Sequence, residues 1–287
     1  MKNKKSFKSG FAAIIGMPNV GKSTLLNTIV GQKIAIISDK PQTTRNKILA
    51  IYSTDEEQII FTDTPGIHKP HNKLGEYMVH VANEGMDDTD VLIFVVDASK
   101  KIQETEREIA KNISKTGLPC ILVLNKVDLM KKEDLLPIIA DYSSMHDFAS
   151  IVPVSAKNND GVDILLHDIE DYLEEGPEFY DSDMVTDQPE KQIAAEIIRE
   201  KLLWLLDKEV PHGIAIEITK MQEKEKITNI YATIYCEKAS HKGIIIGKHG
   251  EMLKKIGTMA RGDIEKMLDK KVYLELWVKV KSDWRNS

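Results

Sequence analysis

The stretch Gly16–Ser23 constrains this chain more than any other, because its order Gly-Met-Pro-Asn-Val-Gly-Lys-Ser fits the pattern G-x-x-x-x-G-K-S. The apolar run Phe11–Ile15 before it predicts a buried strand, and Thr24–Val30 after it has helical spacing and ends at a glycine. A strand, a glycine-bounded loop and a helix N-terminus together make a phosphate site, since backbone N–H groups and the helix dipole face the anion. A glycine-rich turn that fits by chance is the alternative.

The loop also carries side chains suited to a nucleotide. Lys22 adds a positive charge beside the phosphates and is a predicted catalytic residue, and the Ser23 hydroxyl can hold Mg²⁺. The residues of this loop predicted to bind the nucleotide are Gly16, Met17, Pro18, Asn19, Val20, Gly21, Lys22 and Ser23.

Three further segments follow predicted strands, where a guanine-nucleotide site needs them. Asp63 can hold the Mg²⁺ shell, and the Gly66 N–H can meet the γ-phosphate, which makes Gly66 a predicted catalytic residue. The Asp128 carboxylate can accept guanine N1–H and N2–H, which adenine cannot supply, so it selects GTP over ATP. A backbone N–H at 155–157 can meet guanine O6. These segments comprise Asp63, Thr64, Pro65, Gly66 and Ile67, then Asn125, Lys126, Val127 and Asp128, then Ser155, Ala156 and Lys157.

A fourth segment, Thr43-Thr44, lies between the first helix and the second strand and can supply a hydroxyl to Mg²⁺. Each segment by itself could be an ordinary polar loop. All of these segments occur in the expected order along the chain, and each lies next to a predicted strand. Together they favour a GTP site in which Ser23, Thr44 and Asp63 hold Mg²⁺.

Alternating strand and helix patterns predict an α/β first domain at 1–175, a mostly parallel sheet with helices on both faces and one antiparallel strand. The expected strands are 11–15, 47–52, 58–62, 91–96, 119–124 and 151–154, and the expected helices are 24–30, 74–86, 105–116, 131–147 and 161–173. Residues 176–189, rich in Glu, Asp, Gly and Pro, are predicted to be a linker.

Charge separates the two ends of the chain. Residues 1–190 hold 20 Lys/Arg against 31 Asp/Glu, a net charge of −11, while residues 191–287 hold 19 against 14, a net of +5. The basic second domain, 190–287, is therefore the better candidate for an anionic partner. Its expected order is a helix, two strands, the loop Gly243–Gly250, a long helix and a last strand.

Within that loop, Gly247-Lys-His-Gly250 resembles the G-x-x-G loop of KH domains, which hold about four nucleotides of single-stranded RNA. Two glycines allow close approach of a sugar–phosphate strand, and the helix that follows favours anions. A glycine-bounded turn between two elements is the alternative. The predicted RNA-binding residues are Lys242, Ile244, Ile246, Gly247, Lys248, His249, Gly250 and Lys254.

Taken together, the segments Gly16–Ser23, Pro41–Arg45, Asp63–His68 and Asn125–Asp128 resemble the Era family of translation-factor-type GTPases. The resemblance spans the whole chain. It implies a Ras-like P-loop domain followed by a smaller α+β KH domain of type II, with Thr44 as the metal-ligating and catalytic threonine. It also implies slow GTP hydrolysis coupled to binding of the 3′ end of 16S rRNA, a role in maturation of the small ribosomal subunit, and peripheral association with the membrane.

Two residues bear on the rate of hydrolysis. Ile67 occupies the position where Ras-type enzymes carry a water-orienting Gln, so slow intrinsic turnover is expected. Asn19 is a candidate K⁺ ligand near the β- and γ-phosphates, as in relatives with Asn there; an ordinary turn residue is the alternative. His68 as a general base is not favoured. An assembly factor whose hydrolysis is only a timer, and a GTPase of tRNA modification, remain alternative functions.

The sequence also bears on the compartment of the protein and on its tryptophans. No apolar stretch approaches the ~20 residues of a membrane span, and two distant cysteines suit a reducing compartment, so a soluble, cytoplasmic monomer is expected. Trp277 is predicted to lie in the core, and Trp284 could stack on a base. The apolar residues of the helix at 190–207 are also assigned to the core, namely Ile193, Ile197, Leu202, Leu205 and Leu206.

Overall fold

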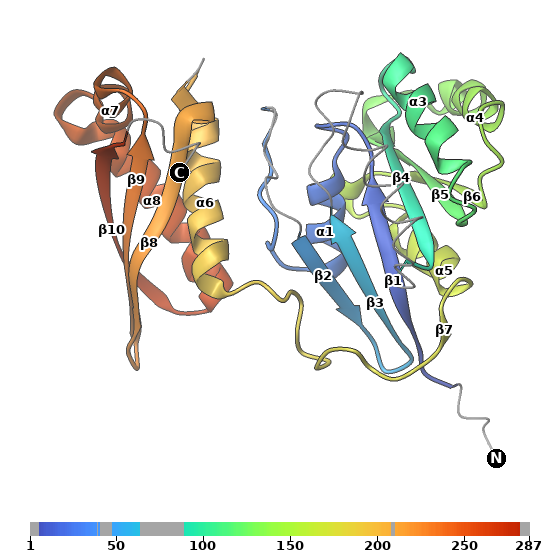
Figure 1. Cartoon of the computed structure of the whole chain (residues 1–287), viewed down its shortest axis with the longest axis horizontal. Helices are drawn as coiled ribbons and strands as arrows, with labels where there is room; N and C mark the ends of the chain where they lie inside the picture. Colours follow the sequence, from blue (N-terminus) through green and yellow to red (C-terminus); the bar gives the residue numbers. More distant parts are fainter. Residues whose placement is uncertain (1–5, 39, 41–47, 64–88, 208–209, 282–287) are drawn as a thin grey trace. The chain divides into compact units, whose positions relative to one another are not determined.

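The computed structural model describes residues 6–38, 40, 48–63, 89–207 and 210–281 (Figure 1). Contacts divide the chain into two units, each with its own hydrophobic core. One unit comprises Met1–Ile34 and Thr44–Asp187, and the other Ala35–Thr43 and Gln188–Ser287. The expected helix at 74–86 lies outside the described residues.

The first unit is built on one sheet with the strand order β2-β3-β1-β4-β5-β6. Only β2 runs antiparallel along this path, and the two-residue β7 adds an antiparallel pair to β1. Every residue of β4 is buried, as expected for a central strand. The strands are β1 (Lys8–Ile15), β2 (Ile48–Ser53), β3 (Glu57–Asp63), β4 (Val91–Asp97), β5 (Cys120–Asn125), β6 (Ser150–Val154) and β7 (Glu174–Glu175). The predicted Ras-like architecture is confirmed.

Helices cover both faces of this sheet (Figure 1). On one face, α3 (Glu104–Ile113) and α4 (Leu135–Ser143) pack on β1, β4 and β5, while α1 (Lys22–Val30) and α5 (Val162–Glu170) cover the other. The helix expected at 131–147 is shorter than predicted. It begins as a single 3₁₀ turn, Lys132–Asp134, and α4 places Pro137 in its first turn, where proline costs no helical hydrogen bond.

The segment predicted to be a linker is packed against the first unit. Its backbone binds Gln58, whose Oε1 accepts from the N–H groups of Phe179 and Tyr180 at 2.7 and 3.0 Å. Further along, the Ile51 N–H donates to the Val185 carbonyl at 2.9 Å. Little regular structure forms there, as its composition indicates, yet the segment is held along β2 and β3 until Asp187, so its freedom is smaller than expected.

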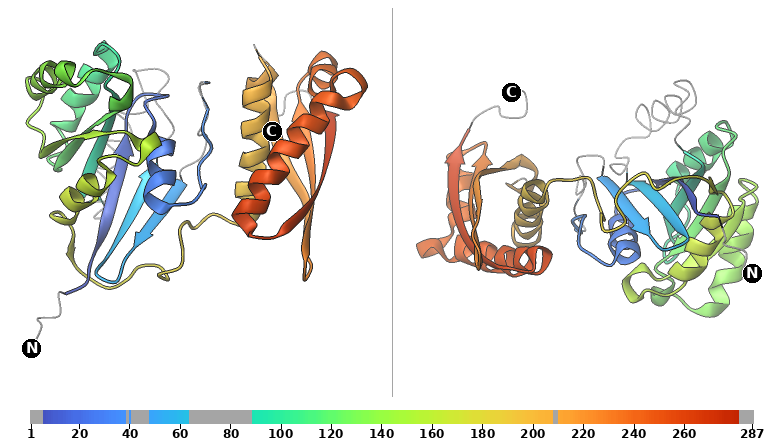
Figure 2. Two further views of the ribbon diagram at one scale, coloured as in Figure 1. Left: turned by 180° about the vertical axis from the view of Figure 1, so that it is seen from behind. Right: turned by 90° about the horizontal axis from the view of Figure 1, so that it is seen from below.

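The second unit has the order α-β-β-α-α-β: α6 (Glu190–Leu205), β8 (Ile214–Glu223), β9 (Ile227–Cys236), α7 (Ala239–Ile246), α8 (Glu251–Leu268) and β10 (Lys271–Val280). The expected elements are present, but residues 243–246, expected in the loop, form the end of α7. Its sheet order is β10-β9-β8, with β9 antiparallel to β8 and parallel to β10. The three helices pack on one face of this sheet (Figure 2). The predicted core residues of α6 lie there, with Leu205 partly buried.

One core prediction is wrong. Trp277 lies on the face of the sheet opposite the helices and is 59% exposed. Trp284 lies outside the described residues. Both cysteines are buried and unpaired, and burial raises the pKa of the Cys120 thiol to about 12. Among the described helices, none has the length and apolar character to cross a membrane.

Candidate functional site

Parallel pairing brings the predicted nucleotide loops to one edge of the first sheet. Ile14 of β1 pairs with Asp63 of β3, and Asp97 at the end of β4 pairs with Asn125 at the end of β5. Asn125 in turn pairs with Val154, directly before Ser155. All five parallel strands end at this edge, and the described loops that follow β1, β4, β5 and β6 lie near the N-terminus of α1. This is the edge at which a doubly wound sheet binds its ligand.

The two glycines of the phosphate loop are required by close contacts. At Gly16, with φ of 150°, an added Cβ would lie 2.3 Å from the Val95 carbonyl oxygen of β4. At Gly21, with φ of 102°, it would lie 2.2 Å from Asn125 Nδ2. No side chain fits at either position, so the loop can approach a phosphate with its bare backbone.

Lys22 is placed over this loop. Its Nζ donates to the carbonyls of Gly16 and Met17 at 3.1 and 2.9 Å, and the side chain is buried although it is charged. The ammonium group therefore lies where the loop curls around, the position from which it can neutralise a phosphate. The catalytic role of Lys22 stays a prediction.

Asn125 is hydrogen-bonded to two other loops of the site. Its Nδ2 donates to the Val20 carbonyl at 2.8 Å, and its Oδ1 accepts from the Ala156 N–H at 3.1 Å. The side chain is buried, so both bonds lie out of water. Thr28 of α1 adds to this link because its hydroxyl donates to the Ala156 carbonyl at 2.8 Å. Asn125 and Ala156 are thus structural bridges between the phosphate loop and the base-binding loops.

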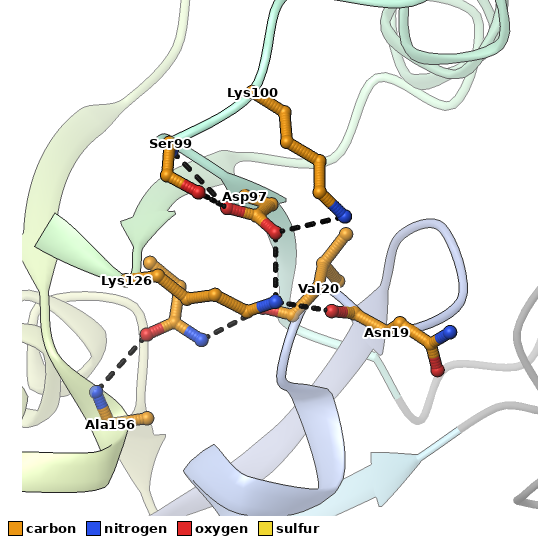
Figure 3. Close-up of polar contacts among 8 residues, drawn as sticks. Asn19, Val20, Asp97, Ser99, Lys100, Lys126 and Ala156 are labelled. Atoms are coloured by element: carbon orange, nitrogen blue, oxygen red, sulfur yellow. Dashed lines mark hydrogen bonds and ion pairs between the residues drawn. The ribbon is translucent and has the colours of Figure 1, made fainter. Parts of the chain in front are cut away.

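Asp97 is a site residue that the sequence reasoning missed. It is 5% exposed, and its Oδ2 accepts from Lys126 Nζ at 2.8 Å and pairs with Lys100 Nζ at 3.3 Å (Figure 3). Lys126 Nζ also donates to the Asn19 carbonyl at 2.6 Å, so its stem spans from β5 to the phosphate loop. A signal existed: Asp97 ends an apolar strand at the ligand edge, as Asp63 and Asn125 do.

The hydrogen bonds and charges around Asp97 affect its pKa more than its burial does. Burial alone raises its pKa, but the hydrogen bonds from Lys126 and Ser99 and the charges of Lys126 and Lys100 lower it, and the pKa lies below its ordinary value. Asp97 is therefore ionised at neutral pH and holds Lys126 extended. Lys126 itself adopts a left-handed backbone conformation with φ of 67°, which turns the chain toward Asp128.

Asp128 is held in place by a hydrogen bond from Ser155. Its Oδ1 accepts from the Ser155 hydroxyl at 2.6 Å, and the residue is otherwise exposed. A carboxylate fixed in this way presents its remaining lone pairs to a donor pair such as guanine N1–H and N2–H. A backbone N–H at 155–157 was expected to meet guanine O6, but the N–H groups of Ser155 and Ala156 donate to Asp160 and Asn125. The Ser155 hydroxyl instead orients Asp128. Lys157 is exposed in the following 3₁₀ turn, and Val127 packs against the core.

The predicted metal ligands are only partly described. Ser23 lies in the first turn of α1, and Asp63 ends β3. Among the described residues, no three His, Cys, Asp or Glu side chains gather to hold an ion. A serine hydroxyl and phosphate oxygens are hard ligands that suit Mg²⁺, which would neutralise phosphate charge when bound. The predicted residues outside the described part of the chain are Thr43, Thr44, Thr64, Pro65, Gly66, Ile67 and His68.

The second unit presents the G-x-x-G loop between α7 and α8. Gly247 and Gly250 have φ of 75° and 79°, and His249 between them has φ of 51°. An added Cβ at Gly247 would lie 2.6 Å from Met252 Cβ, so this glycine is required by packing. The loop ends at the N-terminus of the 18-residue helix α8, whose dipole favours an anion.

Side chains around this loop suit a nucleic acid. Lys248, His249 and Lys254 are exposed, and Lys242 is half-buried. Of the predicted apolar contacts, Ile244 is exposed and Ile246 packs partly on the core, while Ile245 between them is fully buried. An exposed isoleucine beside cations and glycines is the combination that contacts bases and phosphates together.

Comparison with known proteins agrees with this picture. A family model described as 50S ribosome-binding GTPase matches residues 11–126, and a KH domain model matches residues 209–285. GTPase Era of Ruminiclostridium cellulolyticum is 58% identical over 283 residues, covering 98% of this chain and 95% of that protein. GTPase Era of Clostridioides difficile is 54% identical with the same coverage.

Solved structures extend the similarity to three dimensions. An Aquifex aeolicus Era variant bound to GDP·AlF4⁻ matches with a TM-score of 0.88 and 42% identity, covering 97% of this chain and 96% of that one. Era in complex with MgGDPNP and nucleotides 1506–1542 of 16S ribosomal RNA matches with the same TM-score and identity, covering 97% and 95%.

Proposed function

This chain belongs to the Era family of GTPases, which hydrolyse GTP, and we propose that it couples its nucleotide state to binding of the 3′ end of 16S rRNA during maturation of the small ribosomal subunit. The proposal rests above all on one observation. A guanine-recognition loop held by Asn125 and Ser155, and a G-x-x-G loop at the head of α8, occur in one chain. A solved structure that aligns over 97% of this chain holds Era with MgGDPNP and nucleotides of 16S rRNA.

In this function the predicted site residues have distinct tasks. Lys22 neutralises phosphate charge as GTP binds, while Asp128 selects guanine. Mg²⁺, held through Ser23, Asp63 and Thr44, supplies charge stabilisation at the β- and γ-phosphates when bound. Because Ile67 has no group that can orient the attacking water, we expect a low intrinsic rate. A rate that RNA or small subunits do not raise would favour hydrolysis as a timer.

A physical route for the coupling begins at the segment that precedes Thr43 and Thr44. By its contacts this segment belongs to the second unit. The Ile37 N–H donates to Glu200 Oε1 at 2.8 Å, and its carbonyl accepts from Trp204 Nε1 at 2.7 Å. Lys40 Nζ also donates to the Leu206 carbonyl. Binding of the Thr44 hydroxyl to Mg²⁺ beside the γ-phosphate would therefore act on a chain segment that α6 holds.

The coupling is tested by RNA affinity in two nucleotide states. The full chain with Mg²⁺ and either GDP or a non-hydrolysable GTP analogue is titrated into a labelled RNA from the 3′ end of 16S rRNA. We expect tighter binding with the analogue. Equal affinity in both states would refute the coupling. Trp204→Phe, which keeps the ring but removes the donor to Ile37, should narrow the difference between the two states.

The loop's part in RNA binding needs a charge-matched control. Lys248→Asp should weaken RNA binding in both nucleotide states, because it reverses a charge between the two glycines. Lys226→Asp makes the same change in the exposed turn between β8 and β9 and should have little effect. Equal losses in the two variants would assign the effect to net charge and contradict the assigned loop.

We further propose that Asn19 binds K⁺ near the β- and γ-phosphates. Asn19 is exposed on the phosphate loop with φ of 64°, a conformation that asparagine tolerates better than most residues. Asn19→Gly keeps this conformation but removes the amide oxygen, so it separates a ligand from a turn residue. Turnover should be faster in KCl than in NaCl for the natural chain and equal in the variant. Equal rates for the natural chain would refute the proposal.

For its location we propose a cytoplasmic monomer with peripheral membrane association. Two buried free cysteines suit a reducing compartment, and the net charge of +5 over residues 191–287 suits an anionic surface. Light scattering and co-sedimentation with anionic and neutral vesicles test the two parts separately. A dimer, or equal sedimentation with both vesicles, would contradict them.

A further inference from the structure

The face of the second sheet that the helices leave uncovered carries a cluster of aromatic rings. Side chains at alternate positions of β9 and β10 point to this face: Tyr231 and Tyr235 from β9, and Tyr273 and Trp277 from β10. Tyr273 is 48% exposed and Trp277 59% exposed. Large aromatic side chains usually bury most of their surface, so four on one open face call for a function. We name this set the aromatic face.

The rings are held in place by their neighbours. The Tyr231 and Tyr273 rings meet edge to face with centroids 6.1 Å apart. Glu275 accepts from Trp277 Nε1 at 2.8 Å and from the Tyr273 hydroxyl at 3.0 Å. Glu275 fixes these two rings at their polar ends while about half of each side chain stays exposed, so little conformational entropy is lost when a ligand stacks on them.

Lysine side chains lie around the rings. Lys220 Nζ lies 5.9 Å from the Tyr231 centroid, and Lys281 Nζ lies 5.9 Å from the Tyr235 centroid. Lys279 pairs with Tyr235 in the strand register and is exposed. The acidic residues on this face are Glu217, which accepts from the Tyr235 hydroxyl at 2.7 Å, and Glu275. Exposed lysines around stacking rings suit a flexible polyanion with planar groups.

From this arrangement we propose that the aromatic face is a second contact for single-stranded RNA, in which bases stack on Trp277 and Tyr273 while Lys220, Lys279 and Lys281 neutralise phosphates. The site goes beyond the proposed function, which places RNA at Gly247–Gly250, and rests on it only for the identity of the RNA.

The two contacts can share one RNA strand. Helix α7, which leads into the G-x-x-G loop, packs on β10 and β9 from the helix side of the sheet. β10 is an edge strand, and its opposite face carries Tyr273 and Trp277. An RNA that fills the loop can therefore continue around this edge to the aromatic face. A loop of this kind holds about four nucleotides, so only a longer RNA reaches the second contact.

The proposal is tested by comparing the affinity for a short and a longer RNA. Labelled RNAs of about four and about ten nucleotides from the 3′ end of 16S rRNA are titrated with the full chain. Trp277→Ala should weaken binding of the longer RNA about 5-fold to 100-fold, in the range of one lost base stack, and leave the shorter one unchanged. Trp277→Phe keeps a ring and should retain most of the affinity. Thermal unfolding shows whether the variants fold.

Other outcomes overturn the proposal. If Trp277→Ala binds both RNAs like the natural chain, bases do not stack there, and weaker binding of this variant to whole small subunits would then mark a protein contact. If both RNAs weaken equally, Trp277 acts through the G-x-x-G loop. Failure of the proposed function looks different, because the natural chain would then fail to bind even the short RNA.

Discussion

Replacing Asn125 by Asp tests the central claim that one amide joins the phosphate loop to the base-binding loops. The change converts the Nδ2 donor into an oxygen and barely alters the side chain's shape. The Ala156 N–H keeps its acceptor, but the buried Val20 carbonyl loses its donor and instead faces a carboxylate oxygen. Asn125→Asp therefore removes only the hydrogen bond to the Val20 carbonyl and places two acceptor oxygens against each other.

The magnitude follows from burial. An unsatisfied buried acceptor costs about 1–3 kcal/mol, and the carboxylate oxygen that faces the Val20 carbonyl adds to that, so we expect a total of about 2–4 kcal/mol. If this cost appears in nucleotide binding, the affinity for GDP falls about 30-fold to 1000-fold. Fluorescent GDP titration and urea unfolding with and without Mg·GDP measure how the cost divides between binding and folding.

The pH dependence separates this mechanism from general damage. Burial beside the Val20 carbonyl should raise the pKa of the new carboxyl, and its protonated form can again donate to that carbonyl. Affinity of the variant should recover as the pH is lowered from about 8 to about 6. Asn112→Asp on the half-exposed surface of α3 is the matched control. Unchanged GDP affinity, or a loss without recovery at lower pH, would refute the reasoning.

Three further predictions use other contacts of the site. Gly21→Ala should weaken GDP binding strongly because its Cβ would meet Asn125. Gly31→Ala is also at positive φ but has open space around it, so it should cost only about 1 kcal/mol of stability. Similar effects of the two variants on GDP binding would contradict the packing argument. Asp128→Asn should lower GTP affinity at least about 100-fold and favour xanthosine triphosphate, whose C2 carbonyl accepts from the new amide, as competition binding would show. The pKa of Asp97 is lowered in the folded state, so its contribution to stability is present above about pH 4 and is lost as the pH falls through the folded-state pKa. In Asp97→Asn the free energy of unfolding in urea should therefore fall less between neutral and acid pH than in the natural chain. An equal fall in both proteins would disprove this.

Most of the nucleotide site was predictable because its signals are local in sequence. A glycine, a lysine and a serine at set spacing between a strand and a helix specify the phosphate loop, and parallel strands bring their ends to one edge. The link from Lys126 to Asp97 could not be predicted in the same way, since it depends on two side chains from adjacent strands meeting across the sheet. Sequence spacing carries no direct record of that distance.

The error at Trp277 has a different cause. β10 is apolar on both faces near its end, so hydrophobicity alone does not tell which face meets the helices. Its neighbours on the same face, Glu275 and Lys279, carry the missing signal, because two charges flanking a residue at spacing two indicate a solvent-facing row. The packed linker at 176–189 was missed because its bonds to Gln58 and Ile51 use backbone groups, which every composition offers.

Gly21 and Asn125 show why the two halves of the nucleotide site act as one. Gly21 must lack a side chain because Asn125 lies against it, and Asn125 in turn holds the carbonyl of Val20, the residue before Gly21. The same amide positions Ala156, next to the serine that orients Asp128. If guanine binds at Asp128 and the phosphates bind at the loop 16–23, as we propose, each ligand should stabilise the loop that binds the other. This reciprocity predicts that guanosine and inorganic phosphate, added together, bind more tightly than either does alone.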